Sequence, residues 1–154
     1  MKIRTALAIT VLAASLQAAE PIEGRWLLQS QELGGQKMEI EELTLRVIPK
    51  DKTLEFAYSV PVNDIQFVSL RFAAPPNGTP ADVTDANGKK VGTVKVTRAS
   101  ATQYKIVLEG PNRPTATGSM TISADGKTLT SQSDSKPPGQ TNPTHMVQIF
   151  ARQQ

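Results

Sequence analysis

Hydrophobic and polar residues alternate along most of the chain beyond residue 40. The alternation has a period of two, which is the period of a β-strand that buries one face and exposes the other. The alternating runs cover residues 43–47, 54–60, 68–72, 94–96, 104–108, 120–122 and 147–151. Only residues 38–43 have a composition that allows one short helical turn. The pattern therefore predicts an all-β protein.

Residues that favour tight turns separate these runs at short intervals. Glycine accepts the positive φ of a hairpin turn, and it occurs at Gly34-Gly35, Asn87-Gly88 and Asp125-Gly126. Longer connections that contain proline cover residues 75–80, 111–114 and 137–143. We expect about nine or ten strands in an antiparallel up-and-down meander. Because closure removes exposed strand edges, we favour a closed barrel of about 8–10 strands, with a β-sandwich as the alternative.

Residues 1–18 have the organisation of a secretory signal peptide. Lys2 and Arg4 form a positive start, an apolar run follows, and small residues end the segment at Ala18-Ala19. The apolar run is too short to cross a bilayer as a stop-transfer helix. We expect cleavage after Ala18 or Ala19, which leaves residues 19–154 as a single domain in the periplasm or outside the cell.

Removal of this leader changes what the composition implies. The net charge falls from +3 to +1, because Lys2 and Arg4 leave with the leader. A nearly neutral chain with scattered basic residues and 5% aromatic residues is not typical of nucleic-acid binding. Few aromatic residues and an end at Gln153-Gln154 also argue against an outer-membrane barrel with two aromatic girdles. The absence of cysteine excludes disulfides, so the domain depends on its hydrophobic core.

The residue types that carry catalysis or bind metals do not form a recognisable motif. His145 is the only histidine, and no Gly-x-Ser-x-Gly elbow is present. One histidine and no cysteine do not supply the usual ligands of a transition-metal site. Residues 85–89 begin like a calcium loop, but Val94 stands where a bidentate glutamate is needed, so we interpret them as a hairpin turn. We expect no catalytic residue, no metal and no cofactor.

The only tryptophan, Trp26, lies at the start of the first predicted strand. An indole near the base of a narrow barrel can close that end, while its N–H needs a polar partner. Gly24 lets the chain pass without a Cβ clash, and Arg152 on the last strand can stack on the ring. We expect Trp26 to contact Arg152 and the first strand to pair with the last. On the last strand we expect Val147 and Ile149 to face inward, which gives Arg152 the opposite parity.

A Gly-x-Trp start with an arginine near the end of the last strand resembles the lipocalins and the wider calycin group. A closer resemblance is to uncharacterised secreted bacterial lipocalin-like proteins, through the hairpin of residues 123–130 (SADGKTLT) and the terminal Phe150-Ala151-Arg152. The resemblance implies a barrel in which Gly24, Trp26 and Arg152 form the closure. It departs from the lipocalin pattern in two respects: no C-terminal helix follows the last strand, and by strict alternation Arg152 does not share the parity of the inward residues Val147 and Ile149.

Five residues with inward parity on different strands are candidates for a ligand pocket: Tyr58, Phe72, Tyr104, Leu108 and Met120. Together they can line an apolar pocket with two hydroxyl groups, or they can fill a solid core. The first case predicts an exported, non-enzymatic binding protein for a small apolar or amphipathic molecule, with no nucleic-acid partner and no membrane span. The alternative is an interaction or inhibitor protein with a filled core that acts through its proline-rich loops.

Overall fold

The structure is a computed structural model that describes residues 19–40, 42–63, 65–111, 113–137 and 139–154. The predicted leader, residues 1–18, lies outside the described residues. Each alternating run of the sequence becomes a strand or part of one, because alternation lets one face of the strand enter the core. The strands are β1 (Gly24–Leu33), β2 (Gln36–Lys37), β3 (Thr44–Lys50), β4 (Thr53–Val62), β5 (Ile65–Ala74), β6 (Ala81–Asp85), β7 (Lys90–Arg98), β8 (Gln103–Gly110), β9 (Arg113–Ile122), β10 (Thr128–Lys136) and β11 (Thr144–Gln153).

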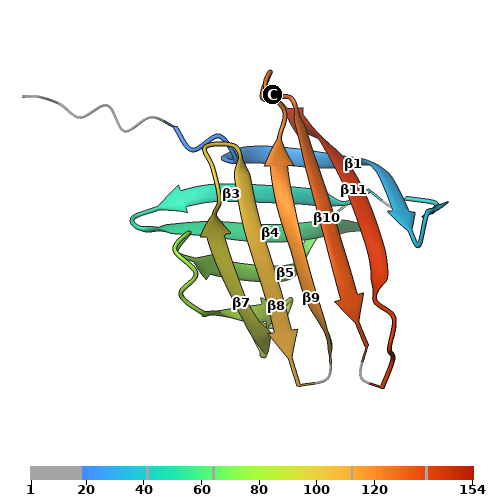
Figure 1. Ribbon diagram of the computed structural model, residues 1–154. Coiled ribbons are helices and arrows are strands. Elements are labelled where there is room, and N and C mark those ends of the chain that lie inside the picture. The colour runs from blue at the N-terminus through green and yellow to red at the C-terminus, as the bar shows by residue number, and fades with distance from the viewer. Residues whose placement is uncertain (1–18, 41, 64, 112, 138) are drawn as a thin grey trace, which may run out of the picture.

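The strands form one antiparallel meander that closes on itself. Each strand from β3 to β10 pairs with the next along the chain, β1 pairs with β3, and β11 pairs with β1. The closed barrel has ten strands, and the two-residue β2 pairs only with the end of β1. In Figure 1, β3, β4 and β5 run crosswise to β8–β11, so the two walls of the barrel cross each other. The predicted closed barrel is confirmed, and the sandwich is not formed.

Three connections, β1–β2, β6–β7 and β9–β10, are hairpin turns at the predicted glycines. Gly34, Gly35, Gly88 and Gly126 all have positive φ, which other residues adopt only with strain. The connection predicted at residues 111–114 is shorter than expected, because β8 ends at Gly110 and β9 begins at Arg113. In the part of the chain that the structure describes, no helix is long and apolar enough to cross a membrane.

The hydrophobic core fills the part of the barrel around Trp26, which we call the sealed half. Trp26, Phe56, Tyr104 and Phe150 have no exposed surface there. The Phe56 and Phe72 rings stack with their centroids 4.7 Å apart. The other buried apolar residues of this core are Ile22, Leu28, Leu45, Val47, Leu54, Ala74, Val83, Val94, Val96, Met120, Ile122 and Leu129.

The inward face of β11 differs from the prediction. Phe150 is fully buried, whereas Ile149 is 37% exposed, so the prediction that Val147 and Ile149 face inward is wrong. Phe150 lies directly opposite Leu28 on β1 and Leu129 on β10, and both of these are buried. Because directly paired residues share a face, the large ring joins this core and Arg152 follows on the same side.

Candidate ligand-binding cavity

The base of the barrel is closed by Trp26 and the residues around it. The indole N–H of Trp26 donates a hydrogen bond to the carbonyl of Ile22 at 3.0 Å. Trp26 is paired across the seam with Arg152, whose guanidinium carbon lies 4.1 Å from the ring centroid. This geometry is a cation–π contact at the place where the first and last strands meet.

The Arg152 guanidinium also holds the chain that precedes β1. It donates hydrogen bonds to the carbonyls of Gly126 and Pro21, each at 2.6 Å, and to that of Glu23. Gly24 has a φ of 135°, and a Cβ at this position would lie 2.8 Å from an Arg152 nitrogen. A glycine is therefore required where the chain turns beneath the arginine to enter β1.

A second set of contacts, made by Glu20, Arg98 and Tyr104, closes the same end. The Tyr104 hydroxyl donates to the Glu20 carboxylate at 2.9 Å and accepts a hydrogen bond from Arg98 at 3.1 Å. Arg98 forms an ion pair with Glu20 as well. Tyr104 was a pocket candidate from the sequence, but it is fully buried in the core and does not line the cavity, although it pairs directly with Met120, which does.

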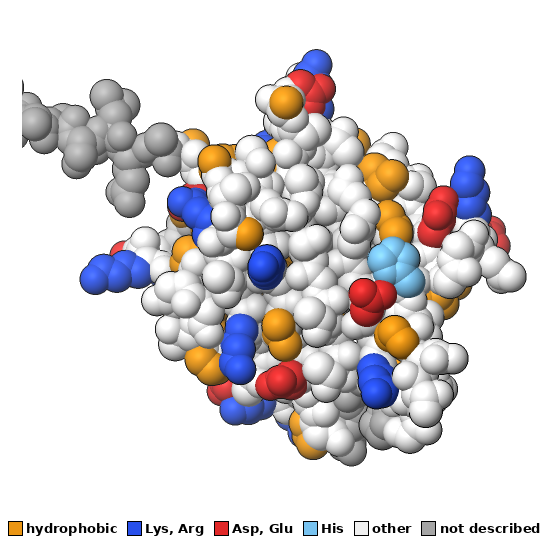
Figure 2. Space-filling view, viewed as in Figure 1, with side chains coloured by type: hydrophobic (Ala, Val, Ile, Leu, Met, Phe, Trp, Pro, Cys, Tyr) orange, Lys and Arg blue, Asp and Glu red, His pale blue; other side chains and the backbone are white. Residues whose placement is uncertain are grey.

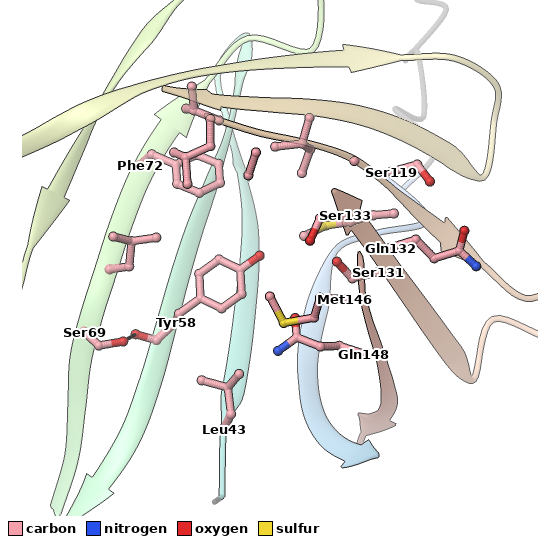
Figure 3. A pocket seen from close by; sticks show the side chains of 17 residues that line it. Leu43, Tyr58, Ser69, Phe72, Ser119, Ser131, Gln132, Ser133, Met146 and Gln148 are labelled. Atoms are coloured by element: carbon pink, nitrogen blue, oxygen red, sulfur yellow. Dashed lines mark hydrogen bonds between the residues drawn. The ribbon is translucent and has the colours of Figure 1, made fainter. Parts of the chain in front are cut away.

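Beyond the core, the barrel encloses a partly open cavity of about 420 Å³. Figure 3 shows the 17 side chains that line it. The other four candidates from the sequence, Tyr58, Phe72, Leu108 and Met120, are among them. Phe72 and Met120 are also part of the core, so they form the floor of the cavity.

The cavity has one apolar wall and one wall with polar groups. The apolar wall comes from the residue just before β3 and from β5, β7 and β8, and it includes Leu43, Leu70, Phe72, Val94, Ile106 and Leu108. Ser131, Ser133 and Gln148 of the adjacent strands β10 and β11 lie on the opposite side, as Figure 3 shows. The side-chain amide of Gln148 donates to the Gln31 side chain at 2.9 Å, which fixes its position.

Sequence reasoning did not identify this polar wall. Gln148 and Met146 have the inward parity of Phe150, which the prediction assigned to the outer face. Ser131 and Ser133 were missed because only apolar and aromatic residues were considered as pocket candidates. The available signal was the alternation that continues from Leu129 along β10, since its inward positions become serine after the leucine.

Tyr58 carries a hydroxyl group into the cavity from β4, and in Figure 3 it points from the apolar wall towards β10 and β11. Burial disfavours the phenolate and raises the pKa of Tyr58 well above its usual range. The side chain is therefore a neutral hydrogen-bond donor at physiological pH. Its backbone carbonyl accepts a hydrogen bond from Ser69 at 3.2 Å, where a bulge interrupts the pairing of β4 with β5.

Charged side chains lie outside the cavity. None of the described residues that line it is Asp, Glu, Lys, Arg or His. His145 lies at the surface, with its Nδ1 2.8 Å from the carboxylate of Asp134, and Figure 2 shows the histidine beside an acidic group. Among the described residues, no three His, Cys, Asp or Glu side chains are grouped as a metal site would need. The cavity can therefore offer hydrogen bonds and apolar contact.

Comparisons with known proteins support the fold. No protein-family model matches the chain, and no curated protein matches it in sequence. Zebrafish ileal bile acid-binding protein complexed with cholic acid is similar in structure, with a TM-score of 0.56 and 16% identity over 86% of this chain and 99% of that one. EF1p2_mFAP2b bound to DFHBI is similar with a TM-score of 0.50 and 15% identity, over 88% and 97% of the two chains. At these identities the likeness shows the fold, a closed antiparallel β-barrel, and no more.

Proposed function

We propose that this protein is an exported binding protein that holds a small apolar or amphipathic molecule inside its β-barrel. The observation that carries the proposal is the cavity of about 420 Å³ above a fully packed core. Ligand sites commonly have volumes of about 300–1,000 Å³ and apolar walls with a few polar groups. The bile acid-binding protein and the DFHBI-bound barrel, both named for complexes with small molecules, support this use of the fold.

The proposed activity is binding without a chemical step. A serine nucleophile needs an adjacent base, and no histidine or carboxylate is found among the described residues that line the cavity. The alternative of an interaction protein required a solid core. The hollow above Phe72 and Met120 therefore favours the binding protein over that alternative.

Export is supported by the leader-like residues 1–18 and by the contacts that follow them. Glu20, Pro21 and Glu23 hold the base of the barrel, and cleavage after Ala18 or Ala19 leaves all three in the mature chain. Intact-mass measurement of the protein from its own host should give a chain that begins at Ala19 or Glu20. A full-length mass would contradict the export proposal.

The binding proposal is tested by titrating the protein with a neutral fluorescent apolar dye such as Nile red. The unmodified protein should bind the dye with saturation. Leu108→Trp fills the cavity from β8 and should weaken dye binding at least about tenfold, which corresponds to about 1.4 kcal/mol. Lys105→Trp, on the exposed face of the same strand, is the matched control and should leave binding unchanged. Equal effects of the two substitutions, or no saturable binding, would contradict the proposal.

A further inference from the structure

We propose that the cavity selects uncharged molecules with their polar groups along one edge, and that it discriminates against carboxylates and ammonium ions of the same size. This inference rests on the proposed binding function and adds the chemical class of the ligand. It follows from the charge and the arrangement of the lining side chains.

The charge of the side chains that line the cavity determines which ligands it accepts. The described lining residues carry no formal charge, so the cavity provides no counter-ion for a bound acid or amine. Moving an ion from water into such a site loses its hydration without an opposite charge to replace it. Arg98 and Arg152 are engaged at the far side of the core, where they bond to Glu20 and to backbone carbonyls. These two cations are therefore separated from a ligand by the packed residues of the sealed half.

A row of polar side chains runs along one side of the cavity. Ser131 and Gln148 are directly paired across β10 and β11, and Ser133 lies one inward position further along β10. These side chains form a short row that can both donate and accept hydrogen bonds. One amide hydrogen of Gln148 is used by Gln31, which leaves its amide oxygen free to accept. The row matches a ligand edge that carries hydroxyl, carbonyl or amide groups.

The wall opposite this row is mostly apolar. Leu43, Leu70 and Phe72 offer only apolar contact opposite this row, so the remaining faces of the ligand are apolar. The Tyr58 hydroxyl reaches across towards the polar row, as Figure 3 shows, and it makes no hydrogen bond within the described residues. A neutral phenol at this place donates a hydrogen bond to a ligand oxygen and provides no charge.

The experiment measures displacement of bound Nile red by decanol, decanoate and decylammonium at neutral pH. Decanol should displace the dye at a concentration at least about tenfold lower than either ion. When the pH is lowered so that decanoate becomes protonated, its displacement curve should approach that of decanol. This second measurement uses the unmodified protein and one ligand, so chain length and the fold are held constant.

A matched pair of variants tests whether the lining controls this preference. Gln148→Lys places a cation in the polar row and should improve decanoate relative to decanol at least about tenfold. Gln153→Lys makes the same substitution at an exposed position of β11 that does not line the cavity, and it should leave the ratio unchanged. Thermal denaturation of each variant checks that it is folded. If Gln148→Lys does not fold, the pH measurement on the unmodified protein still tests the inference.

The outcomes separate the two proposals. If decanoate or decylammonium displaces the dye as well as decanol does, the selectivity is wrong while the binding function stands. If protonation of decanoate has no effect, or if a folded Gln148→Lys variant behaves like Gln153→Lys, the lining does not set the preference and the inference fails. If neither the dye nor decanol binds with saturation, the proposed function itself fails.

Discussion

The half of the barrel around Trp26 and the half around Tyr58 are built from the same strands, but their inward-facing side chains fill the space differently. In the sealed half, Trp26, Tyr104 and Phe150 are fully buried and close the base. In the other half, Tyr58, Leu108 and Met146 are only partly buried and surround the cavity. The backbone continues through both halves, so the size of the side chains decides where the barrel is solid.

Two neighbouring strands show how this change is made. Along β9, the inward residues away from the sealed half are Ile122, Met120, Gly118 and Ala116. Along β10, they are Leu129, Ser131 and Ser133. Each series begins with a large buried residue and ends with small ones, so the wall recedes and leaves room. The decrease in side-chain volume along these strands, and not a change of topology, therefore produces the cavity.

Truncation of Trp26, which closes the base of the barrel, should have the largest effect on stability. Trp26→Ala removes a fully buried ring with a hydrogen bond and a cation–π contact, so it should lower the free energy of unfolding by about 3–5 kcal/mol. Arg152→Ala should cost less, and a double-mutant cycle should show coupling of at least about 0.5 kcal/mol. Equilibrium urea denaturation measures all three variants.

A control for this truncation is available at the other end of the barrel. Phe67 on β5 is 51% exposed, so Phe67→Ala should change the free energy of unfolding by no more than about 0.5 kcal/mol. If Trp26→Ala costs as little as Phe67→Ala, the base of the barrel is not the main source of its stability.

Added volume gives the second test, because a solid half and a hollow half should respond differently. Leu129→Trp forces a larger ring into the sealed half and should destabilise the protein by about 1–3 kcal/mol through overpacking. Leu108→Trp has the cavity to occupy and should cost less than about 1 kcal/mol. Urea denaturation of the two variants measures the difference. Equal losses would mean that the cavity is not available to a side chain.

The closed meander could be predicted from the sequence because its signals are local and repeated. Two-residue alternation determines the strands, and glycine pairs such as Gly34-Gly35 determine the hairpins. Trp26 and Arg152 could be placed together because a long antiparallel meander needs its first and last strands to meet. The contact between them, including the stacking of the guanidinium on the ring, is present in the structure.

The cavity could not be predicted to the same extent, because its position depends on the register between distant strands. Tyr104 and Tyr58 look alike in the sequence, since each belongs to a run of alternating large apolar residues. Tyr104 lies at the sealed end because of the pairing of β8 with β7 and the hydrogen bond between its hydroxyl and the Glu20 carboxylate. Neither contact can be read from the local sequence. Gln148 had the parity of Phe150, but the apolar outer residues Val147 and Ile149 made the opposite face look like the core.

The two tyrosines provide the third test, because each can lose only its hydroxyl. Tyr104→Phe removes the hydrogen bonds to Glu20 and Arg98 and should lower the free energy of unfolding by about 0.5–1.5 kcal/mol. Tyr58→Phe should leave stability within about 0.5 kcal/mol and instead weaken the binding of a ligand that accepts a hydrogen bond. Denaturation and dye displacement are measured on both variants. A larger stability loss for Tyr58→Phe would reverse the assignment of the two residues.

The smallest expected effect concerns the turn that supports Arg152. The hydrogen bond from Ser123, followed by that from the Lys127 backbone, lowers the pKa of Asp125. Because the folded-state pKa is depressed, this contribution to stability is complete above the unfolded-state pKa of about 3.9 and is lost as the pH falls through the folded-state value.

Asp125→Asn should therefore reduce the loss of stability between about pH 6 and about pH 3, as measured by urea denaturation at both values. Ser123→Ala removes the largest cause of the shift and should raise the pKa of Asp125 in an NMR titration. The turn reaches the sealed half through Gly126, whose carbonyl accepts the Arg152 hydrogen bond. The acid-sensitive part of the effect should consequently appear in stability and leave dye binding by the folded protein unchanged. An equal pH dependence in Asp125→Asn and the unmodified protein would show that this carboxylate does not support the base of the barrel.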